Sequence, residues 1–270
     1  MVSAQAAAEP SAFRIPIPKR KTKRKKKQEK QQTKQTNGAL RARRRRIEGE
    51  RTALAASIFN LGKVILASES PRRLQLLRLA GCDCAVFAHP IDETRQIGEA
   101  PHAYCLRMAI EKNRAARQAL AQRGPKGALA DLDASLPLVS GDTAVVADNE
   151  VLGKPKDRND AKRMLAKLAG RSHLVLSAVC VSTAHFEKAE LSVSEVSFDA
   201  LSDETIESYL DLGEYAGKAG AYAIQGAAQV FVKKISGSYS GVMGLPLREA
   251  AALIAEAAQS RAENGGPSVP

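Results

Sequence analysis

Residues 64–81 read VILASESPRRLQLLRLAG and contain, in order, the patterns of a strand, a turn and a helix. The apolar run at the start, residues 64–67, is typical of a buried strand. Ser70 has the side chain of a helix N-cap, Pro71 suits the first helical position, and Gly81 marks the helix end. A strand that runs directly into a helix is the repeating unit of α/β proteins, so this stretch predicts that fold class.

The start of this helix also predicts an anion-binding turn. Ser70 supplies a hydroxyl, Arg72 and Arg73 supply two guanidinium groups, and the helix N-terminus adds backbone N–H groups that carry partial positive charge. Arginines that merely face solvent at an ordinary helix start would give the same local sequence. The turn alone therefore leaves both interpretations open.

Strands and helices continue to alternate along the rest of the chain. The predicted helices are 101–122, 157–168, 202 onward and 247–258, and the predicted strands are 138–139, 144–146, 174–182, 192–198 and 230–235. This alternation predicts a single α/β domain with a mixed twisted sheet flanked by helices. Ligands of such sheets bind among the loops at the strand ends, so we expect a central substrate cleft there.

The positive charge of the chain is concentrated at its start. Residues 1–52 carry 17 Lys or Arg and 4 Glu, a net of +13 against a total of +12, which leaves the remainder near −1. Low hydrophobicity and self-repulsion predict a disordered basic extension over residues 1–60, followed by a folded domain over 61–260 and a flexible tail over 261–270. Nucleic acid could bind only through the extension, which could equally be a solvated segment or reflect a start codon placed too far upstream.

The cysteines and the hydropathy indicate a cytoplasmic protein. Cys82, Cys84, Cys105 and Cys180 form neither a paired C-x-x-C pattern nor a dense disulfide framework, so reduced thiols are predicted. The sequence has no apolar stretch of membrane-spanning length, and no apolar segment follows the N-terminal charges as it does in a signal peptide. We expect no membrane partner.

The segment Gly141-Asp142-Thr143 places a carboxylate inside an apolar strand region. We predict a tight turn here. A charge in such a place is costly unless something uses it, which makes Asp142 a candidate functional residue. Asp142 could be a general base or a metal ligand, and it could also be an Asx-turn residue bonded to its own backbone. Downstream, Lys154 in a Gly-Lys-Pro sequence is a candidate phosphate contact, although a lone lysine is more often solvated.

Three further segments combine charge or small residues with an apolar context. Residues 91–94 contain adjacent carboxylates, and residues 107–112 form a charged stripe on a predicted helix; both patterns also occur as surface decoration. Residues 218–226 alternate small side chains with one Tyr and one Gln, which suits a ligand close to the backbone or a tight strand crossing. The four histidines lack ligand spacing, and the sequence has no Gly-x-Ser-x-Gly or Walker loop. A Ser-triad hydrolase is not expected.

Taken together, these segments resemble the Maf family of nucleotide pyrophosphatases. The resemblance runs from about Val64 to Ala258, and its five strings occur in the order of the family. They are LASESPRR at 66–73, SGDT at 140–143, GKP at 153–155, KAGAYAIQG at 218–226 and GLPL at 244–247. The basic extension and the loop at 124–137 depart from the family pattern, but neither overlaps a string.

The resemblance implies cleavage of a nucleoside triphosphate between its α- and β-phosphates, as house-cleaning of the nucleotide pool. It implies a divalent cation (Mg²⁺, Mn²⁺ or Co²⁺) as cofactor and the branch of the family that acts on dTTP and UTP. The amide of Gln225 can donate and accept at once, as the O4 and N3–H edge of uracil or thymine requires. The implied residues are Asp142 for catalysis, Arg72, Thr143 and Gln225 for specificity, Ser70, Arg72, Arg73, Lys112 and Lys154 for phosphate binding, and Glu93 and Asp142 for the metal.

Two other functions remain compatible with the sequence. One is a nucleic-acid-associated regulator of cell division that binds through the basic extension. The intact Asp142 and the Arg pair argue against this function. The other is a purine house-cleaning pyrophosphatase of the ITP/XTP type, which Gln225 alone does not exclude. The sequence also leaves open the use of modified pyrimidine nucleotides, the oligomeric state, a homodimer included, and which carboxylate is base and which is metal ligand.

Overall fold

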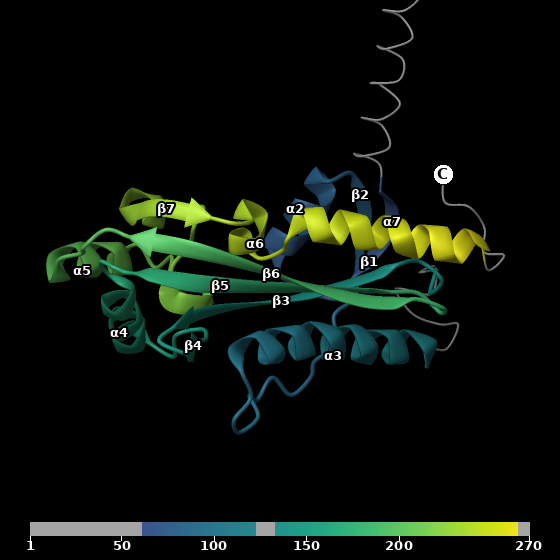
Figure 1. Ribbon diagram of the computed structural model, residues 1–270, viewed down its shortest axis with the longest axis horizontal. Coiled ribbons are helices and arrows are strands. Elements are labelled where there is room, and N and C mark those ends of the chain that lie inside the picture. Colours follow the sequence, from purple (N-terminus) through teal and green to yellow (C-terminus); the bar gives the residue numbers. More distant parts are fainter. Residues whose placement is uncertain (1–60, 123–132, 264–270) are drawn as a thin grey trace, which may run out of the picture. The chain divides into compact units, whose positions relative to one another are not determined.

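A mixed seven-stranded sheet forms the centre of the computed structural model, which describes residues 61–122 and 133–263. The strands lie in the order β2-β1-β3-β5-β6-β7, and β4 pairs with β3 (Figure 1). β1 is parallel to β2 and β3, whereas the other neighbouring pairs are antiparallel. The strand bounds are β1 Gly62–Leu66, β2 Cys82–Val86, β3 Leu138–Ala147, β4 Glu150–Leu152, β5 Ser172–Ser182, β6 Glu187–Phe198 and β7 Val232–Ser236.

Helices cover both faces of this sheet. α3 (Pro101–Ala121) lies along one face, and α6 (Tyr239–Met243) and α7 (Leu247–Glu263) lie along the other (Figure 1). The remaining helices are α2 Pro71–Leu79, α4 Arg158–Leu168, α5 Asp203–Asp211 and the short 3₁₀ helices η1 Ala219–Ala221 and η2 Ala227–Phe231. The predicted α/β domain with a mixed sheet flanked by helices is confirmed. Within the described ranges, no helix has the length and apolarity needed to cross a bilayer.

The strand-to-helix unit that opens the domain forms as the sequence predicts. β1 is buried from Val64 to Leu66, and α2 begins at Pro71. The hydroxyl of Ser70 accepts a hydrogen bond from the backbone N–H of Arg73 at 3.5 Å, which caps the helix. The chain thus leaves the sheet and presents the N-terminus of α2 directly beyond the end of β1.

β3 is one continuous strand, so the predicted turn at residues 141–143 is wrong. β5 pairs with it from Leu138 to Val146 without interruption. Gly141 fits this pairing because a Cβ atom there would lie 2.9 Å from the carbonyl oxygen of Ala178, too close for any side chain. Close backbone approach inside a sheet, not a turn, accounts for the glycine.

The other edge of β3 is only partly used. β1 pairs there with Leu138 and Val139, and β4 pairs with residues 145–147. Between these two partners, no described strand pairs with residues 140–144, which we call the open edge of β3. Two motifs of the sequence therefore meet at one place, since the Gly141-Asp142-Thr143 segment lies within the open edge and α2 starts beside it.

The final helix is longer than predicted. α7 continues to Glu263, because Arg261 is 8% exposed and donates hydrogen bonds to Asp133 at 3.3 Å and to Ser135 at 2.7 Å. Residues 261–263 are therefore helical rather than part of a tail. The predicted disordered extension at 1–60, residues 123–132 of the predicted long loop and residues 264–270 lie outside the described residues.

His173 on β5 is a buried titratable group in the core. It is 3% exposed, shares a 2.9 Å hydrogen bond with the hydroxyl of Tyr222, and packs edge-on against Phe198. Burial lowers the pKa of His173 to about 4. The folded protein thus keeps this ring neutral at a pH where the unfolded chain protonates it.

We predict that folding becomes less favourable as the pH falls from about 6.5 to about 4, at roughly 1.4 kcal/mol per pH unit from this residue. Replacement of His173 by Gln, which can still hydrogen-bond Tyr222, should reduce the stability difference between pH 7 and pH 5 by about 2 kcal/mol. Urea unfolding of both proteins at the two pH values measures this. Equal pH dependence of wild type and variant would contradict the assignment.

Candidate active site

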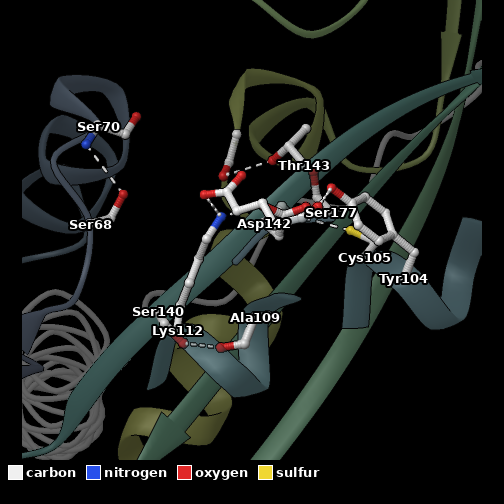
Figure 2. Close-up of polar contacts among 12 residues, drawn as sticks. Ser68, Ser70, Tyr104, Cys105, Ala109, Lys112, Ser140, Asp142, Thr143 and Ser177 are labelled. Carbon is white, nitrogen blue, oxygen red and sulfur yellow. Dashed lines mark hydrogen bonds and ion pairs between the residues drawn. The ribbon is translucent and has the colours of Figure 1, made fainter. Parts of the chain in front are cut away.

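Asp142 lies at the centre of the open edge of β3 and is 8% exposed. Its side chain points to the face covered by α3, where Cys105 and Ala109 of that helix pack against β3 and β5. Lys112, also on α3, extends along this face until its ammonium nitrogen lies 2.8 Å from Oδ1 of Asp142 (Figure 2). The nearly buried carboxylate thus has a counter-charge fixed by the helix.

Glu93 brings a second carboxylate to the same ammonium group. Its Oε1 lies 3.0 Å from Nζ of Lys112, and its side chain is 53% exposed, against 12% for that of Asp142. Glu93 belongs to the loop between β2 and α3, whereas Asp142 belongs to the sheet. One lysine therefore joins a rigid carboxylate and a solvent-facing carboxylate.

Two side chains of α3 hold the loop that carries Glu93. The hydroxyl of Tyr104 donates a 3.0 Å hydrogen bond to the carbonyl oxygen of Glu93. Arg107 donates to the carbonyl of Thr94 at 3.1 Å and forms two bonds with the carboxylate of Glu99, at 2.6 and 2.8 Å. Burial, followed by the charges of Asp142 and Glu93, raises the pKa of Tyr104 to about 12, so its hydroxyl remains a donor.

Arg73 approaches the open edge from the opposite face of the sheet. Its guanidinium group donates to the carbonyl of Gly244 at 2.9 Å, to the hydroxyl of Ser68 at 3.1 Å and to the hydroxyl of Thr143 at 3.4 Å. Burial lowers the pKa of Arg73, and the charge of Asp142 opposes this shift. The guanidinium group is fixed in position and still senses the carboxylate across β3.

The hydroxyl of Thr143 has three hydrogen-bonding neighbours. It accepts from Arg73, donates to the carbonyl of Gly244 at 3.2 Å and lies 3.2 Å from the hydroxyl of Ser177. Ser177 in turn donates to the carbonyl of Gly241 at 2.6 Å. Thr143 therefore ties the open edge of β3 to β5 and to the segment around α6.

Arg72, Lys154 and Gln225 lie outside this contact network, and Ser70 joins it only through the backbone N–H of Arg73 and the hydroxyl of Ser68. Arg72 is half-buried and makes no hydrogen bond or ion pair with a described residue; burial, together with the charge of Arg73, lowers its pKa. Ser70 caps α2. Lys154 and Gln225 have exposed side chains without hydrogen bonds to the described residues.

The loops of Lys154 and Gln225 are nevertheless linked to each other and to β3. The N–H of Gly220 donates to the carbonyl of Gly153 at 3.1 Å. Gly220 itself packs so closely on Val145 that a Cβ would lie 2.9 Å from Cγ1. Among the nine predicted site residues, contacts join Glu93, Lys112 and Asp142 in one group and Ser70, Arg73 and Thr143 in a second. The side chains of Arg72, Lys154 and Gln225 have no hydrogen bond or ion pair with either group.

Sequence reasoning missed several residues of the network. Ser68 lies within the first quoted string and Gly244 within the last, but neither was given a role. Tyr104 lies on the predicted helix 101–122, where nothing in the sequence indicates that it holds the loop of Glu93. Ser177 has no signal in the sequence, because its place opposite Thr143 depends on the register of β5 against β3.

The carboxylates of Asp142 and Glu93 fit a divalent cation that takes its other ligands from phosphate oxygens and water. The carboxylates of Asp142 and Glu93 lie 2.8 and 3.0 Å from the ammonium nitrogen of Lys112, so they already face one positive charge together. Within the described chain, no three or more His, Cys, Asp or Glu residues lie close enough to hold a metal by themselves. Mg²⁺ commonly binds to one or two carboxylates and completes its shell with phosphate oxygens and water, which is the arrangement that this pair would allow.

A surface cavity of about 610 Å³ lies elsewhere, between α3 and the turn that joins β5 to β6. Its lining includes Arg114, Arg117 and Glu187. Arg114 is paired with Glu187, and Arg117 donates to the carbonyl oxygens of Ala134 and Leu136. None of the predicted site residues lines this cavity, so it gives no support to the predicted substrate cleft.

Known proteins similar to this chain share most of its length. The family model described as Maf-like protein matches residues 63–257. A dTTP/UTP pyrophosphatase of Pasteurella multocida is 44% identical over 189 residues, which cover 70% of this chain and 92% of that protein. A dTTP/UTP pyrophosphatase of Ralstonia nicotianae is 47% identical over 200 residues, which cover 72% and 93%. The matched family region contains every predicted site residue.

Likeness to a solved structure is much weaker. The Staphylococcus aureus Ham1 protein superimposes with a TM-score of 0.33 and 14% identity, covering 50% of this chain and 71% of that protein. A similarity this low supports no conclusion about the fold or the function of this protein.

We predict strong energetic coupling between Lys112 and Asp142. Lys112→Met should destabilise the protein by about 3 kcal/mol, because it leaves a nearly buried carboxylate without its counter-charge. In a protein that already carries Asp142→Asn, Lys112→Met should lower the free energy of unfolding by much less. The difference between the two effects is a coupling energy of about 2 kcal/mol. Urea unfolding of the four proteins at pH 7 measures this double-mutant cycle. Effects that add within about 0.5 kcal/mol would show that the ion pair has no such role.

Proposed function

The chain belongs to the Maf-like protein family, and from that premise we propose that it is a nucleoside triphosphate pyrophosphatase, which hydrolyses dTTP and UTP to the monophosphate and pyrophosphate. Its role would be house-cleaning of the nucleotide pool. The observation that carries the proposal is the cluster of Asp142, Lys112 and Glu93 at the open edge of β3. The name dTTP/UTP pyrophosphatase of relatives that are 44% and 47% identical supports it.

The positive groups around the open edge suit a triphosphate. Arg72 is a half-buried cation without a partner among the described residues, so an anion beside it would offset the cost of its burial. The first turn of α2 adds the backbone N–H of Arg72 at the positive end of a helix, since Pro71 has no N–H and that of Arg73 donates to Ser70. The hydroxyl of Ser70, which accepts from Arg73, can still donate to a phosphate oxygen. Arg73, Lys112 and the exposed Lys154 would complete the clamp.

A divalent cation such as Mg²⁺, Mn²⁺ or Co²⁺ would be held by Asp142 and Glu93. When bound, it would offset the negative charge of the phosphate oxygens. Lys112 already keeps the two carboxylates close together, which reduces the repulsion that would otherwise separate them. The cation would therefore meet a carboxylate pair that is assembled in advance.

In the reaction that we propose, a water oxygen attacks the α-phosphorus while Asp142 takes a proton from that water. A new bond forms between phosphorus and the water oxygen, and the bond to the bridging oxygen of the β-phosphate breaks to release pyrophosphate. Asp142 suits the role of base better than Glu93 because its side chain is 12% exposed against 53% and lies on a paired strand. Arg73 and Arg72 hold the phosphates against the charge that develops.

Selection of the nucleotide would depend on Arg72, Thr143 and Gln225. Thr143 would act through Arg73, whose guanidinium group it helps to orient. Gln225 has an exposed amide without hydrogen bonds to the described residues, which leaves a donor and an acceptor for the O4 and N3–H edge of uracil or thymine. A cytosine presents a donor in place of O4 and an acceptor in place of N3–H, so it does not match the amide in the orientation that uracil requires. A purine of the ITP type remains the alternative, and it offers a different shape with a similar edge.

We predict that a panel of nucleotides distinguishes a dTTP and UTP pyrophosphatase from a purine pyrophosphatase of the ITP type. Among dTTP, UTP, CTP, ATP, GTP and ITP, the purified protein should have its highest kcat/KM for dTTP and UTP. It should release one pyrophosphate per nucleotide, and only when Mg²⁺, Mn²⁺ or Co²⁺ is present. The measurement is a coupled assay for pyrophosphate with a parallel assay for orthophosphate. Release of orthophosphate, or highest activity on ITP, would refute the proposal.

A further inference from the structure

The segment that carries Gln225 is anchored on both sides by backbone hydrogen bonds to side chains. Before Gln225, the N–H of Ala223 donates to the hydroxyl oxygen of Tyr209 at 3.0 Å. After it, the N–H of Ala227 donates to Oε2 of Glu214 at 2.9 Å. Between these anchors the Gln225 side chain faces solvent. The backbone of residues 223–227 is therefore fixed, whereas the amide it presents remains available.

Glu214 is also in close contact with the turn itself. A Cβ atom at Gly226 would lie 2.1 Å from Oε2 of Glu214, so the carboxylate occupies the space of a side chain at that position. The N–H of Gly226 closes the turn by donating to the carbonyl of Ala223 at 2.9 Å. Glycine at 226 and glutamate at 214 therefore form one fitted contact directly after Gln225.

Tyr209 connects these contacts to the core. It is 4% exposed, and its ring packs edge-on against Phe231 with 5.3 Å between ring centres. Phe231 packs in turn on Phe198, which contacts Tyr222. Burial, with the charge of Glu214 adding to it, raises the pKa of Tyr209 to about 12. The first anchor is thus a protonated phenol in a rigid aromatic cluster, and Glu214 interacts with it as well as with Ala227.

We propose that Glu214 is a positioning residue for base recognition, one that holds the backbone at Gln225 in the place from which its amide reaches the pyrimidine edge. The inference rests on the proposed function. Recognition of uracil needs the donor and the acceptor of the amide within hydrogen-bond distance of O4 and N3–H together, so a shift of the backbone that carries Gln225 would weaken both contacts. Fixing residues 223–227 sets the position from which the Gln225 side chain reaches the base.

The test compares UTP with CTP, which share the sugar and the triphosphate and differ at the base edge. Glu214→Ala should raise KM for UTP about tenfold with kcat within about twofold, while kcat/KM for CTP changes by less than about twofold. The UTP to CTP selectivity should therefore fall about tenfold. Glu204→Ala, at an exposed glutamate in the first turn of α5, is the matched control and should keep the wild-type selectivity.

Two further variants keep the inference falsifiable if Glu214→Ala does not fold. Glu214→Gln should keep the selectivity within about threefold of wild type, because its amide oxygen can still accept from Ala227. Gly226→Ala should lower the selectivity as Glu214→Ala does, because the new methyl group displaces the flexible carboxylate from Ala227. Equal losses for UTP and CTP, or unchanged selectivity in Glu214→Ala and Gly226→Ala, would overturn the inference alone. A wild-type protein without preference for UTP would overturn the proposed function together with it.

Discussion

The rest of the site depends on the incomplete pairing of β3. One edge of this strand is bonded to β5 along almost its whole length, whereas the other edge is shared by β1 and β4 and left open at residues 140–144. A carboxylate at Asp142 can therefore be supported by a rigid strand and still be reached from one side. The burial of that carboxylate would be costly, and the ammonium group of Lys112 at 2.8 Å offsets the cost.

The two faces of the sheet contribute different chemistry to this open edge. The face under α3 supplies the carboxylates and Lys112, and α3 also holds the loop of Glu93 through Tyr104 and Arg107. The opposite face supplies Arg73, which is held by the hydroxyls of Ser68 and Thr143 and the carbonyl of Gly244. β3 separates the two sets, so the carboxylates with Lys112 and the guanidinium group of Arg73 lie close together without forming one ion cluster. Such a separation suits a reaction in which an anion must be bound beside an ionised base.

Local patterns in the sequence were enough to predict the α/β class, the Ser70 cap and the carboxylate of Asp142 within an apolar strand region, because each follows from neighbouring residues. The prediction of a turn at Gly141 was wrong. The glycine there permits the close approach of β5 within a continuous strand. Ser177 and Glu214 could not be found from sequence, since each acts on a residue brought near by strand register or by helix packing. The last residues of the final helix, beyond 258, were missed for the same reason, because Arg261 is fixed by residues 133 and 135, far away in the chain.

The central claim is that Asp142 at the open edge of β3 takes the proton of the attacking water. The most direct test is kcat for UTP hydrolysis by Asp142→Asn, compared with Asp148→Asn, which changes an exposed aspartate just past the end of the same strand. The account predicts that Asp142→Asn remains folded, as circular dichroism would report, and loses turnover by about 10²- to 10⁴-fold, whereas Asp148→Asn keeps wild-type turnover. Pyrophosphate release by Asp142→Asn at the wild-type rate would contradict it.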